Sequence, residues 1–152
     1  MKCSRTLTRN RRTLRSPKLT RSMVVDTSAL IAIIGNEPEK ERFLQLMVSA
    51  RRVYIPAACL VEACLVLARR MSHVEAERDL RAVIVAARGE IVAADQEIAF
   101  IAIAAAARYW KGTHRAGLNF GDLLSYATAK KLNLPLLFKG NDFGMTDVAF
   151  LQ

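Results

Sequence analysis

Short, largely apolar runs separated by helix-length segments make up most of the sequence between residues 23 and 138. The runs at 23–25, 52–55, 90–94 and 134–138 suit buried strands, and the segment between each two of them suits helices. Strands that alternate with helices pair in parallel, with helices covering both faces of the sheet. The sequence therefore predicts an α/β fold with a short parallel sheet of four or five strands, the fifth lying near the C-terminal end.

Several of the expected helices have recognisable ends. Asn36 and Pro38 are expected to open the second helix, Ser72 to cap the fourth, and Asn133 to end the last. The helices predicted on this basis span residues 28–34, 39–50, 57–71, 73–88, 96–109 and 120–133.

The positive charge is concentrated in the first 22 residues. This segment holds eight of the 23 Lys and Arg residues and no acid, so it carries +8 of the formal net charge of +9. The pI near 10 therefore describes residues 1–22 rather than the expected domain over residues 23–152. Three interpretations of the segment stay open: a disordered basic tail that contacts phosphate, an extension upstream of a working start at Met23, and a transit peptide.

The three cysteines point to a reducing compartment. Cys3, Cys59 and Cys64 form no C-x-x-C pair, and their spacing matches no zinc motif. Cys59 and Cys64 lie in an apolar helical stretch and are interpreted as core residues. Because no apolar run reaches about 18 residues, we expect a soluble, cytoplasmic protein without a membrane partner.

Four acidic residues occupy unusual positions relative to the expected strands and helices. Asp26 and Asp142 each follow a strand, Glu62 interrupts an apolar helix, and Asp122 lies in the first turn of a helix after Gly121. The carboxyl ends of parallel strands are where open α/β sheets bind ligands. These four acids are therefore candidates for one shared site, although each alone also fits a structural role as a cap, ion-pair partner, dipole partner or turn residue.

Four carboxylates in one cleft would repel one another unless a cation lay between them. Mg²⁺ and Mn²⁺ prefer carboxylate and water oxygens, whereas zinc prefers the His and Cys ligands that this chain supplies poorly. One or two such ions could hold a phosphate, generate hydroxide and stabilise a leaving oxygen. The pattern therefore indicates metal-dependent phosphodiester hydrolysis.

The chain resembles the PIN-domain ribonucleases, and specifically the VapC toxins of bacterial type II toxin–antitoxin systems. The resemblance covers about residues 23–148, and it rests on "MVVDTSALIAII", "VEACLVLARR" and above all "HRAGLNFGDLLSYATAK" followed by "PLLFKGNDF". It implies a PIN fold and a Mg²⁺- or Mn²⁺-dependent endoribonuclease. It also implies a homodimer that is silenced by a VapB-like antitoxin. The acidic site of the family maps onto Asp26, Glu62, Asp122 and Asp142.

The match departs from the family pattern in the loop before Asp142. Phe138 and Gly140 stand where many PIN domains carry a hydroxyl or a second acid, so Asp142 is the weakest of the four assignments. Asp147 is the rival for the fourth position, although a structural role is favoured for it.

Polar and basic residues near the acids are candidates for supporting roles. Thr27 or Ser28 is expected to hydrogen-bond a ligand carboxylate or the phosphate, with a helix cap as the alternative for Ser28. The candidates for contacts with RNA are Lys111, His114, Arg115, Asn119 and Lys139, with Tyr109 and Trp110 considered for base stacking or for packing.

The leading hypothesis is therefore a metal-dependent endoribonuclease toxin that acts on RNA. The alternatives are a PIN-like module that binds RNA or a partner without cleaving, and a phosphohydrolase acting on small phosphate esters.

Overall fold

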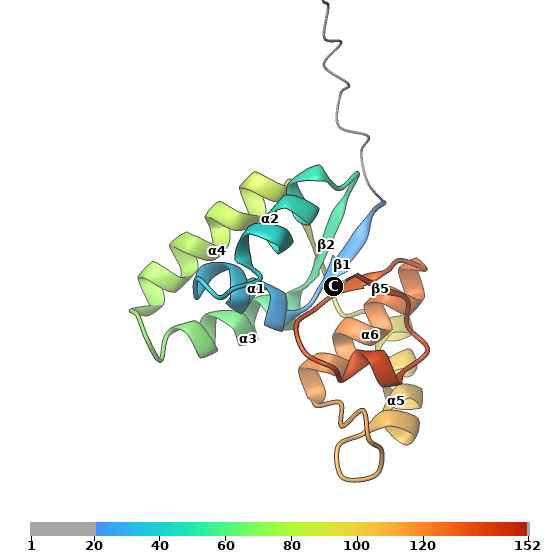
Figure 1. Ribbon diagram of the computed structural model, residues 1–152. Helices are drawn as coiled ribbons and strands as arrows, with labels where there is room; N and C mark the ends of the chain where they lie inside the picture. Colours follow the sequence, from blue (N-terminus) through green and yellow to red (C-terminus); the bar gives the residue numbers. More distant parts are fainter. Residues whose placement is uncertain (1–20, 152) are drawn as a thin grey trace, which may run out of the picture.

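The computed structural model describes residues 21–151, so the predictions for residues 1–20 of the basic segment lie outside the described residues. Its centre is a five-stranded sheet in which all neighbours pair in parallel, in the order β3-β2-β1-β4-β5 (Figure 1). The prediction of a short parallel sheet of four or five strands is confirmed. The strands are β1 (Met23–Val25), β2 (Val53–Pro56), β3 (Gly89–Val92), β4 (Leu136–Leu137) and β5 (Phe150–Leu151).

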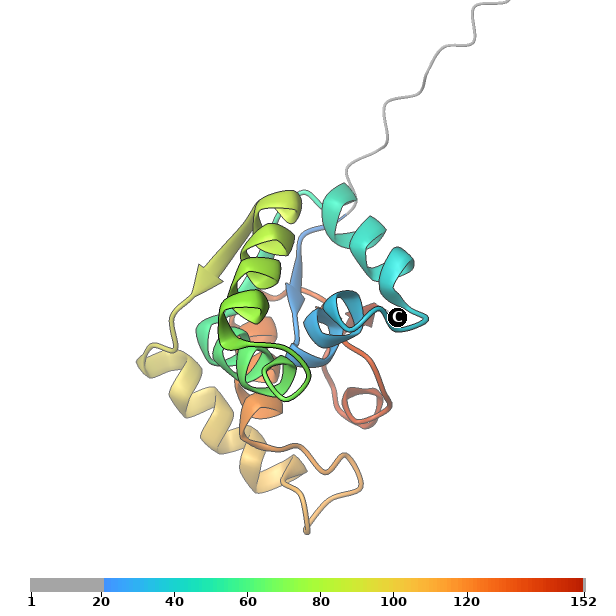
Figure 2. The same cartoon turned by 90° about the vertical axis from the view of Figure 1, so that its left-hand side faces the viewer.

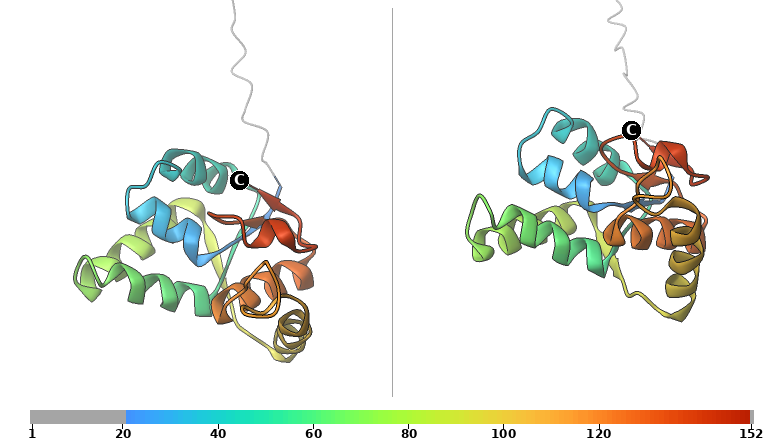
Figure 3. Two further views of the ribbon diagram at one scale, coloured as in Figure 1. Left: turned by 60° about the horizontal axis from the view of Figure 1, so that its bottom comes forward. Right: turned by 90° about the horizontal axis from the view of Figure 1, so that it is seen from below.

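Six α-helices connect the strands within the described range. They are α1 (Thr27–Ile34), α2 (Lys40–Ser49), α3 (Ala57–Leu67), α4 (His73–Ala87), α5 (Gln96–Tyr109) and α6 (Phe120–Leu132), and a short 3₁₀ helix, η1, spans Phe143–Met145. The helices α1 to α4 lie on one side of the strands and α5 and α6 on the other, as the two views in Figure 3 also show. The expected covering of both faces is therefore confirmed.

The strand residues alternate between two hydrophobic cores. Met23 and Val25 of β1 pack with α1 to α4, whereas Val24 faces the core made with α5 and α6. In β4, Leu137 packs in the core with α1 to α4, and Leu136 packs in the core with α5 and α6. This alternation follows from the two-residue repeat of a strand, and it explains why these runs are apolar throughout.

The first two strands each end against the start of a helix. Figure 2, turned by 90° from Figure 1, shows α4 in front of the strands, with α1 and α2 beside it and α5 on the opposite side. Two elements begin at once after a strand: α1 one residue after β1, and α3 directly after β2. Side chains in these first turns therefore lie at the carboxyl edge of the sheet.

The predicted helix ends are right in two places and wrong in one. Ser72 caps α4 in a reciprocal capping box with Glu75, and Asn133 ends α6 in the left-handed conformation, with φ of 51°. Asn36 does not cap the second helix, because it adopts a left-handed turn with φ of 56° and α2 begins only at Lys40. Pro38 accordingly lies in the turn before the helix rather than in its first turn.

Several of the exposed large apolar side chains lie on α3, on α5 and at the two ends of the α5–α6 loop. They are Val61 and Leu65 on α3, Phe100 and Ile103 on α5, and Trp110 and Phe120 at the loop ends. No helix in the range 21–151 is both long enough and apolar enough to cross a membrane.

Candidate metal centre

Asp26 lies at the carboxyl end of the central strand, where it ends β1 and begins α1. Its backbone N–H donates to the carbonyl of Leu137 at 2.9 Å, which continues the pairing of β1 with β4. Its side chain is the N-cap of α1, and the residue is only 2% exposed. An acid that is buried at a strand end cannot be a solvated surface charge, so its partners decide what it can do.

Three protein donors hold the carboxylate of Asp26. Its Oδ2 accepts from the backbone N–H of Ser28 at 2.9 Å and from the Ser28 hydroxyl at 2.6 Å. Its Oδ1 accepts from the hydroxyl of Ser125 on α6, with 2.5 Å between the oxygens. Asp26 therefore caps α1, the role that the sequence allowed for Ser28. Ser28 instead donates hydrogen bonds to the Asp26 carboxylate.

Glu62 projects from the second turn of α3 and is half-buried. The hydroxyl of Thr27 donates to its Oε2 at 2.7 Å. Among the described residues, no Lys or Arg forms an ion pair with Glu62, so the structure does not support the ion-pair alternative. Thr27 and Ser28 thus each donate a hydrogen bond to one of the candidate carboxylates.

Gly121 brings the start of α6 against Glu62. A Cβ atom at residue 121 would stand 2.2 Å from Oε2 of Glu62, which is far inside van der Waals contact. Only glycine permits this approach. This close approach sets Glu62 of α3 and Asp122 of α6 on facing helices next to each other.

Asp122 forms a capping box with Asn119 at the N-terminus of α6. Its backbone N–H donates to Oδ1 of Asn119 at 3.0 Å, and its own Oδ2 accepts from the backbone N–H of Asn119 at 2.8 Å. Burial, followed by the charges of Asp26, Asp142 and Glu62, raises the pKa of Asp122 to about 7, although the Asn119 N–H opposes the shift. The charges of the other three predicted acids therefore all act on Asp122.

Asp142 is exposed and precedes the 3₁₀ helix η1, where it makes no side-chain capping bond. Its negative charge contributes to raising the pKa of Asp122. The rival acid, Asp147, instead accepts from Tyr126 at 2.5 Å and from Tyr109 at 3.3 Å, and it pairs with Lys130 at 3.2 Å. These contacts tie the C-terminal segment to α5 and α6, so Asp147 has the structural role that the sequence favoured.

The donor set of this region fits a hard divalent cation. Asp26, Glu62, Asp122 and Asp142 offer only oxygen ligands, and their mutual repulsion is what such a cation relieves. Within residues 21–151, no three His, Cys, Asp or Glu side chains already stand in ligating geometry. Asp26, Glu62 and Asp122 each accept a hydrogen bond from a protein donor instead. A cation would therefore have to draw the carboxylates together.

The basic candidates divide into two groups. The ammonium group of Lys139 binds Glu37 at 2.6 Å and Glu39 at 2.9 Å, so these two acids neutralise it and the expected contact with phosphate is not supported. Lys111 and Arg115 are exposed. Lys111 also lines a groove next to Glu62.

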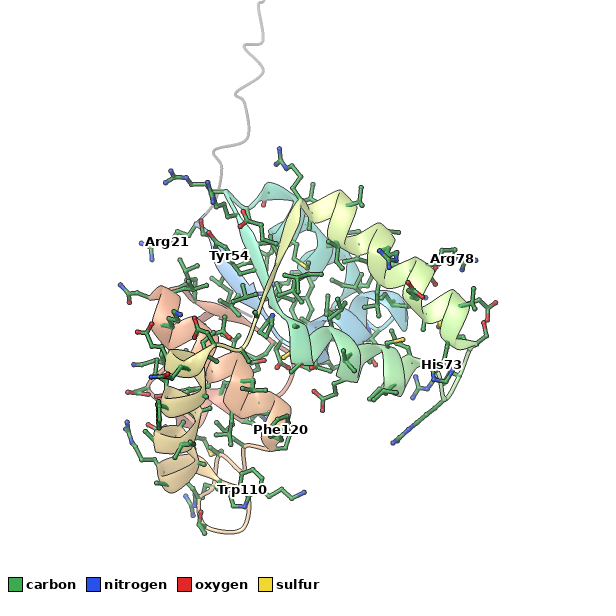
Figure 4. All side chains as sticks on the ribbon, turned by 180° about the vertical axis from the view of Figure 1, so that it is seen from behind. Arg21, Tyr54, His73, Arg78, Trp110 and Phe120 are labelled. Carbon is green, nitrogen blue, oxygen red and sulfur yellow. The ribbon has the colours of Figure 1, made fainter. Side chains whose placement is uncertain are left out.

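The groove is mainly apolar and has a volume of about 710 Å³. Val61 and Leu65 of α3 form one part of it, and Trp110 and Phe120 form another. Figure 4 labels Trp110 and Phe120, which lie at the same end of the molecule. Tyr109, the other aromatic candidate for stacking, is buried and packs edge-on against His114 and Tyr126, so it belongs to the core.

The sequence did not reveal the roles of Ser125 and Cys59. Both side chains are fully buried behind the acids, and their Oγ and Sγ atoms are 2.9 Å apart. The only signal for Ser125 was a hydroxyl one helical turn after Asp122, on the same side of the helix.

Comparison with known proteins gives a family match over nearly all of the described chain. The PIN-domain family model matches residues 23–150. Ribonuclease VapC30 of Mycobacterium tuberculosis is 42% identical over 127 residues, covering 84% of this chain and 96% of the relative.

Solved structures share the fold at lower sequence identity. VapBC2 from Rickettsia felis, bound to a DNA fragment from its promoter, aligns with a TM-score of 0.68 and 15% identity, covering 86% of this chain and 97% of the other. VapC20 of Mycobacterium tuberculosis, a toxin that cleaves the sarcin–ricin loop, aligns with a TM-score of 0.68 and 18% identity, covering 84% and 96%.

Proposed function

Because the chain belongs to the PIN-domain family, and within it to the VapC ribonucleases, we propose that it is the toxin of a type II toxin–antitoxin system. It acts in the cytoplasm as an endoribonuclease that hydrolyses RNA phosphodiester bonds. The observation that supports this most strongly is geometric: Ser125, one turn after Asp122, donates to Asp26, and Gly121, next to Asp122, lies against Glu62. Three acids that lie far apart in the sequence therefore meet at one edge of the sheet. No Lys or Arg in the described chain neutralises Glu62, which a purely structural cluster would require.

The protein depends on a divalent cation, and we propose Mg²⁺ or Mn²⁺ as the ion. Asp26, Glu62 and Asp122 would hold it, directly or through water, and Asp142 would complete the site or hold a second ion. When bound, such an ion supplies Lewis-acid stabilisation of a phosphate and lowers the pKa of bound water.

The side chains around the acids hold the carboxylates in place and supply charge, but they do not take part in the reaction themselves. Ser28 and Thr27 fix the carboxylates of Asp26 and Glu62 by hydrogen bonds of 2.6 and 2.7 Å. Asn119 holds Asp122 at the start of α6. Lys111 provides a positive charge beside the acids, where an RNA backbone would otherwise be repelled.

Two protein partners follow from the same assignment. A VapB-like antitoxin would silence the toxin, as the VapBC assemblies among its structural neighbours suggest. A second copy would form a homodimer, and the exposed apolar side chains of α3 and α5 support a protein interface on that part of the surface.

We further propose that residues 23–152 form the working domain, because the family match begins at residue 23. A variant that lacks residues 1–22 should retain full metal-dependent cleavage. A large loss of RNA affinity, together with a shallower dependence on salt, would instead assign residues 1–22 to phosphate binding.

The function is tested with the purified full chain and a structured RNA. Cleavage should require Mg²⁺ or Mn²⁺ and stop in EDTA, and Asp26→Asn should reduce the rate by about 100-fold or more. Asp79→Asn, which changes a partly exposed acid on α4 that pairs with Arg78, is the matched control and should cleave normally. Wild-type rates for Asp26→Asn would refute the proposal. RNA binding without cleavage at any metal concentration would favour the binding module.

A further inference from the structure

The carboxylate of Asp26 has one acceptor position left after its protein contacts are counted. An ionised carboxylate offers about four lone-pair positions. Two hydrogen bonds from Ser28 occupy Oδ2, and one from Ser125 occupies Oδ1. The remaining position is therefore on Oδ1, and the direction in which it points is set by Ser125.

The direction of the hydrogen bonds behind Asp26 follows from counting protons. A carboxylate can only accept, so the hydroxyl of Ser125 donates its single proton to Oδ1 of Asp26. Ser125 therefore has no proton left for Cys59, and in the 2.9 Å contact between the two side chains the thiol is the donor. The thiol also faces the carbonyl of Gly121 at 3.8 Å, a longer and therefore weaker contact. Burial raises the pKa of Cys59 to about 12, so the thiol keeps the proton that the contact with Ser125 needs.

The two residues connect the elements that carry the acids. Cys59 lies one turn before Glu62 on α3, and Ser125 lies one turn after Asp122 on α6. Both are 0% exposed, so neither can contact RNA directly. Together they form a chain of hydrogen bonds from α3 through α6 to the end of β1.

From this geometry we propose that Cys59 and Ser125 are positioning residues that orient Oδ1 of Asp26 toward the divalent cation. The inference rests on the proposed function, because it assigns the two residues to that same site. Outer partners of this kind typically change metal affinity by about 10- to 100-fold when they are removed. A merely structural role would change the stability of the fold but leave the affinity for the cation unchanged.

The test measures Mn²⁺ binding to the full chain by isothermal titration calorimetry, with thermal unfolding in EDTA to confirm that each variant is folded. Ser125→Ala should raise the Kd for Mn²⁺ by about 10- to 100-fold. Thr128→Ala is the matched control, because Thr128 is buried one turn later on α6 and its hydroxyl donates only to the carbonyl of Leu124. That variant should bind Mn²⁺ like the wild type.

Variants of Cys59 test the order of this relay, by which we mean the chain of hydrogen bonds from Cys59 through Ser125 to Asp26. Cys59→Ser keeps a donor and should bind Mn²⁺ nearly as well as the wild type, whereas Cys59→Ala should weaken binding. Because Cys59 acts through Ser125, the double variant Cys59→Ala/Ser125→Ala should bind no more weakly than Ser125→Ala alone. Additive losses would overturn the relay.

The outcomes separate this inference from the proposed function. If the wild type binds Mn²⁺, Asp26→Asn does not and Ser125→Ala binds normally, the relay is wrong and the metal site stands. If neither the wild type nor Asp26→Asn binds Mn²⁺, both proposals are overturned.

Discussion

At the scale of single residues, the candidate site depends on small groups that control where the carboxylates point. Thr27, Ser28 and Ser125 each donate a hydroxyl proton to an acid, and Gly121 leaves the space that Oε2 of Glu62 occupies. None of these residues is charged. Their contribution is to fix the orientation of carboxylates that repel one another, and a bound cation would relieve that repulsion.

Gly121→Ala tests this directly. The new Cβ would meet Glu62 at 2.2 Å, so Glu62 has to move away. We expect RNA cleavage to fall by about 10- to 100-fold, while the helix itself gains from the replacement of glycine. Gly144→Ala is the control, because a Cβ there meets nothing within 4 Å. Equal activity of the two variants would show that the close approach is unimportant.

The sequence singled out the four acids as candidates because their positions, after a strand, inside an apolar helix or in the first turn of a helix, are local features. It could not predict how Ser125 acts, because that residue bonds to an acid 99 positions away. The direction of such a bond depends on packing that no local pattern records. Lys139 illustrates the same limit, since its partners Glu37 and Glu39 lie about 100 residues away in the sequence. Because Lys139 pairs with these two acids, its expected contact with phosphate is not supported.

At the scale of elements, the last segment of the chain depends on one cluster of polar contacts. Asp147 accepts hydrogen bonds from Tyr109 and Tyr126 and pairs with Lys130. These contacts fasten the segment containing Asp142 and β5 against α5 and α6. Strand β5 is only two residues long, so its own pairing contributes little to holding the segment in place.

The stability contributed by Asp147 should depend on pH. The hydrogen bond from Tyr126, followed by those from Lys130, lowers the pKa of Asp147 in the folded protein. Its contribution is therefore present above the unfolded pKa, near 3.9, and is lost as the pH falls through the lower folded value. Asp147→Asn should cost about 1 kcal/mol of unfolding free energy at pH 7, since the partly exposed carboxylate is screened by solvent.

Urea unfolding followed by circular dichroism measures this difference. The gap between wild type and Asp147→Asn should be largest near pH 7 and should close in acid below the folded pKa. A gap that persists unchanged in acid would show that the ionised carboxylate is not the source of the stability.

Most of the secondary structure followed from periodicity and from capping residues such as Ser72 and Asn133. The start of α2 did not, because Asn36 tolerates the left-handed conformation and the turn extends to Glu39. Strand β4 is also shorter than the apolar run at 134–138 that predicted it. In both cases the apolar pattern fixes where a segment packs but not where its hydrogen bonding begins.

At the scale of the whole molecule, the parallel sheet collects residues from the entire chain at one edge. Asp26 follows the central strand, and Glu62 and Asp122 come from helices on opposite sides of the sheet. Beside this edge, exposed apolar side chains line a groove between α3 and the start of α6. Phe120 is 71% exposed there, an arrangement that favours contact with another protein.

If this surface joins two copies, Leu65→Asp should shift the full chain toward the monomer, because a charge would be buried in the interface. Size-exclusion chromatography with light scattering, over a range of concentrations, measures the change. Val74→Asp, on the exposed face of α4 and outside the groove, should leave the assembly unchanged. A Leu65→Asp variant that remains dimeric at all concentrations would exclude this surface as the homodimer interface.

The most direct measurement is a crystal structure of the full chain soaked in Mn²⁺, with anomalous diffraction used to locate the ion. We expect an anomalous peak within coordination distance, about 2.0–2.3 Å, of carboxylate oxygens from Asp26, Glu62 and Asp122, with Asp142 beside it. No peak among these oxygens, or a peak elsewhere on the molecule while the four side chains stay apart, would contradict this expectation.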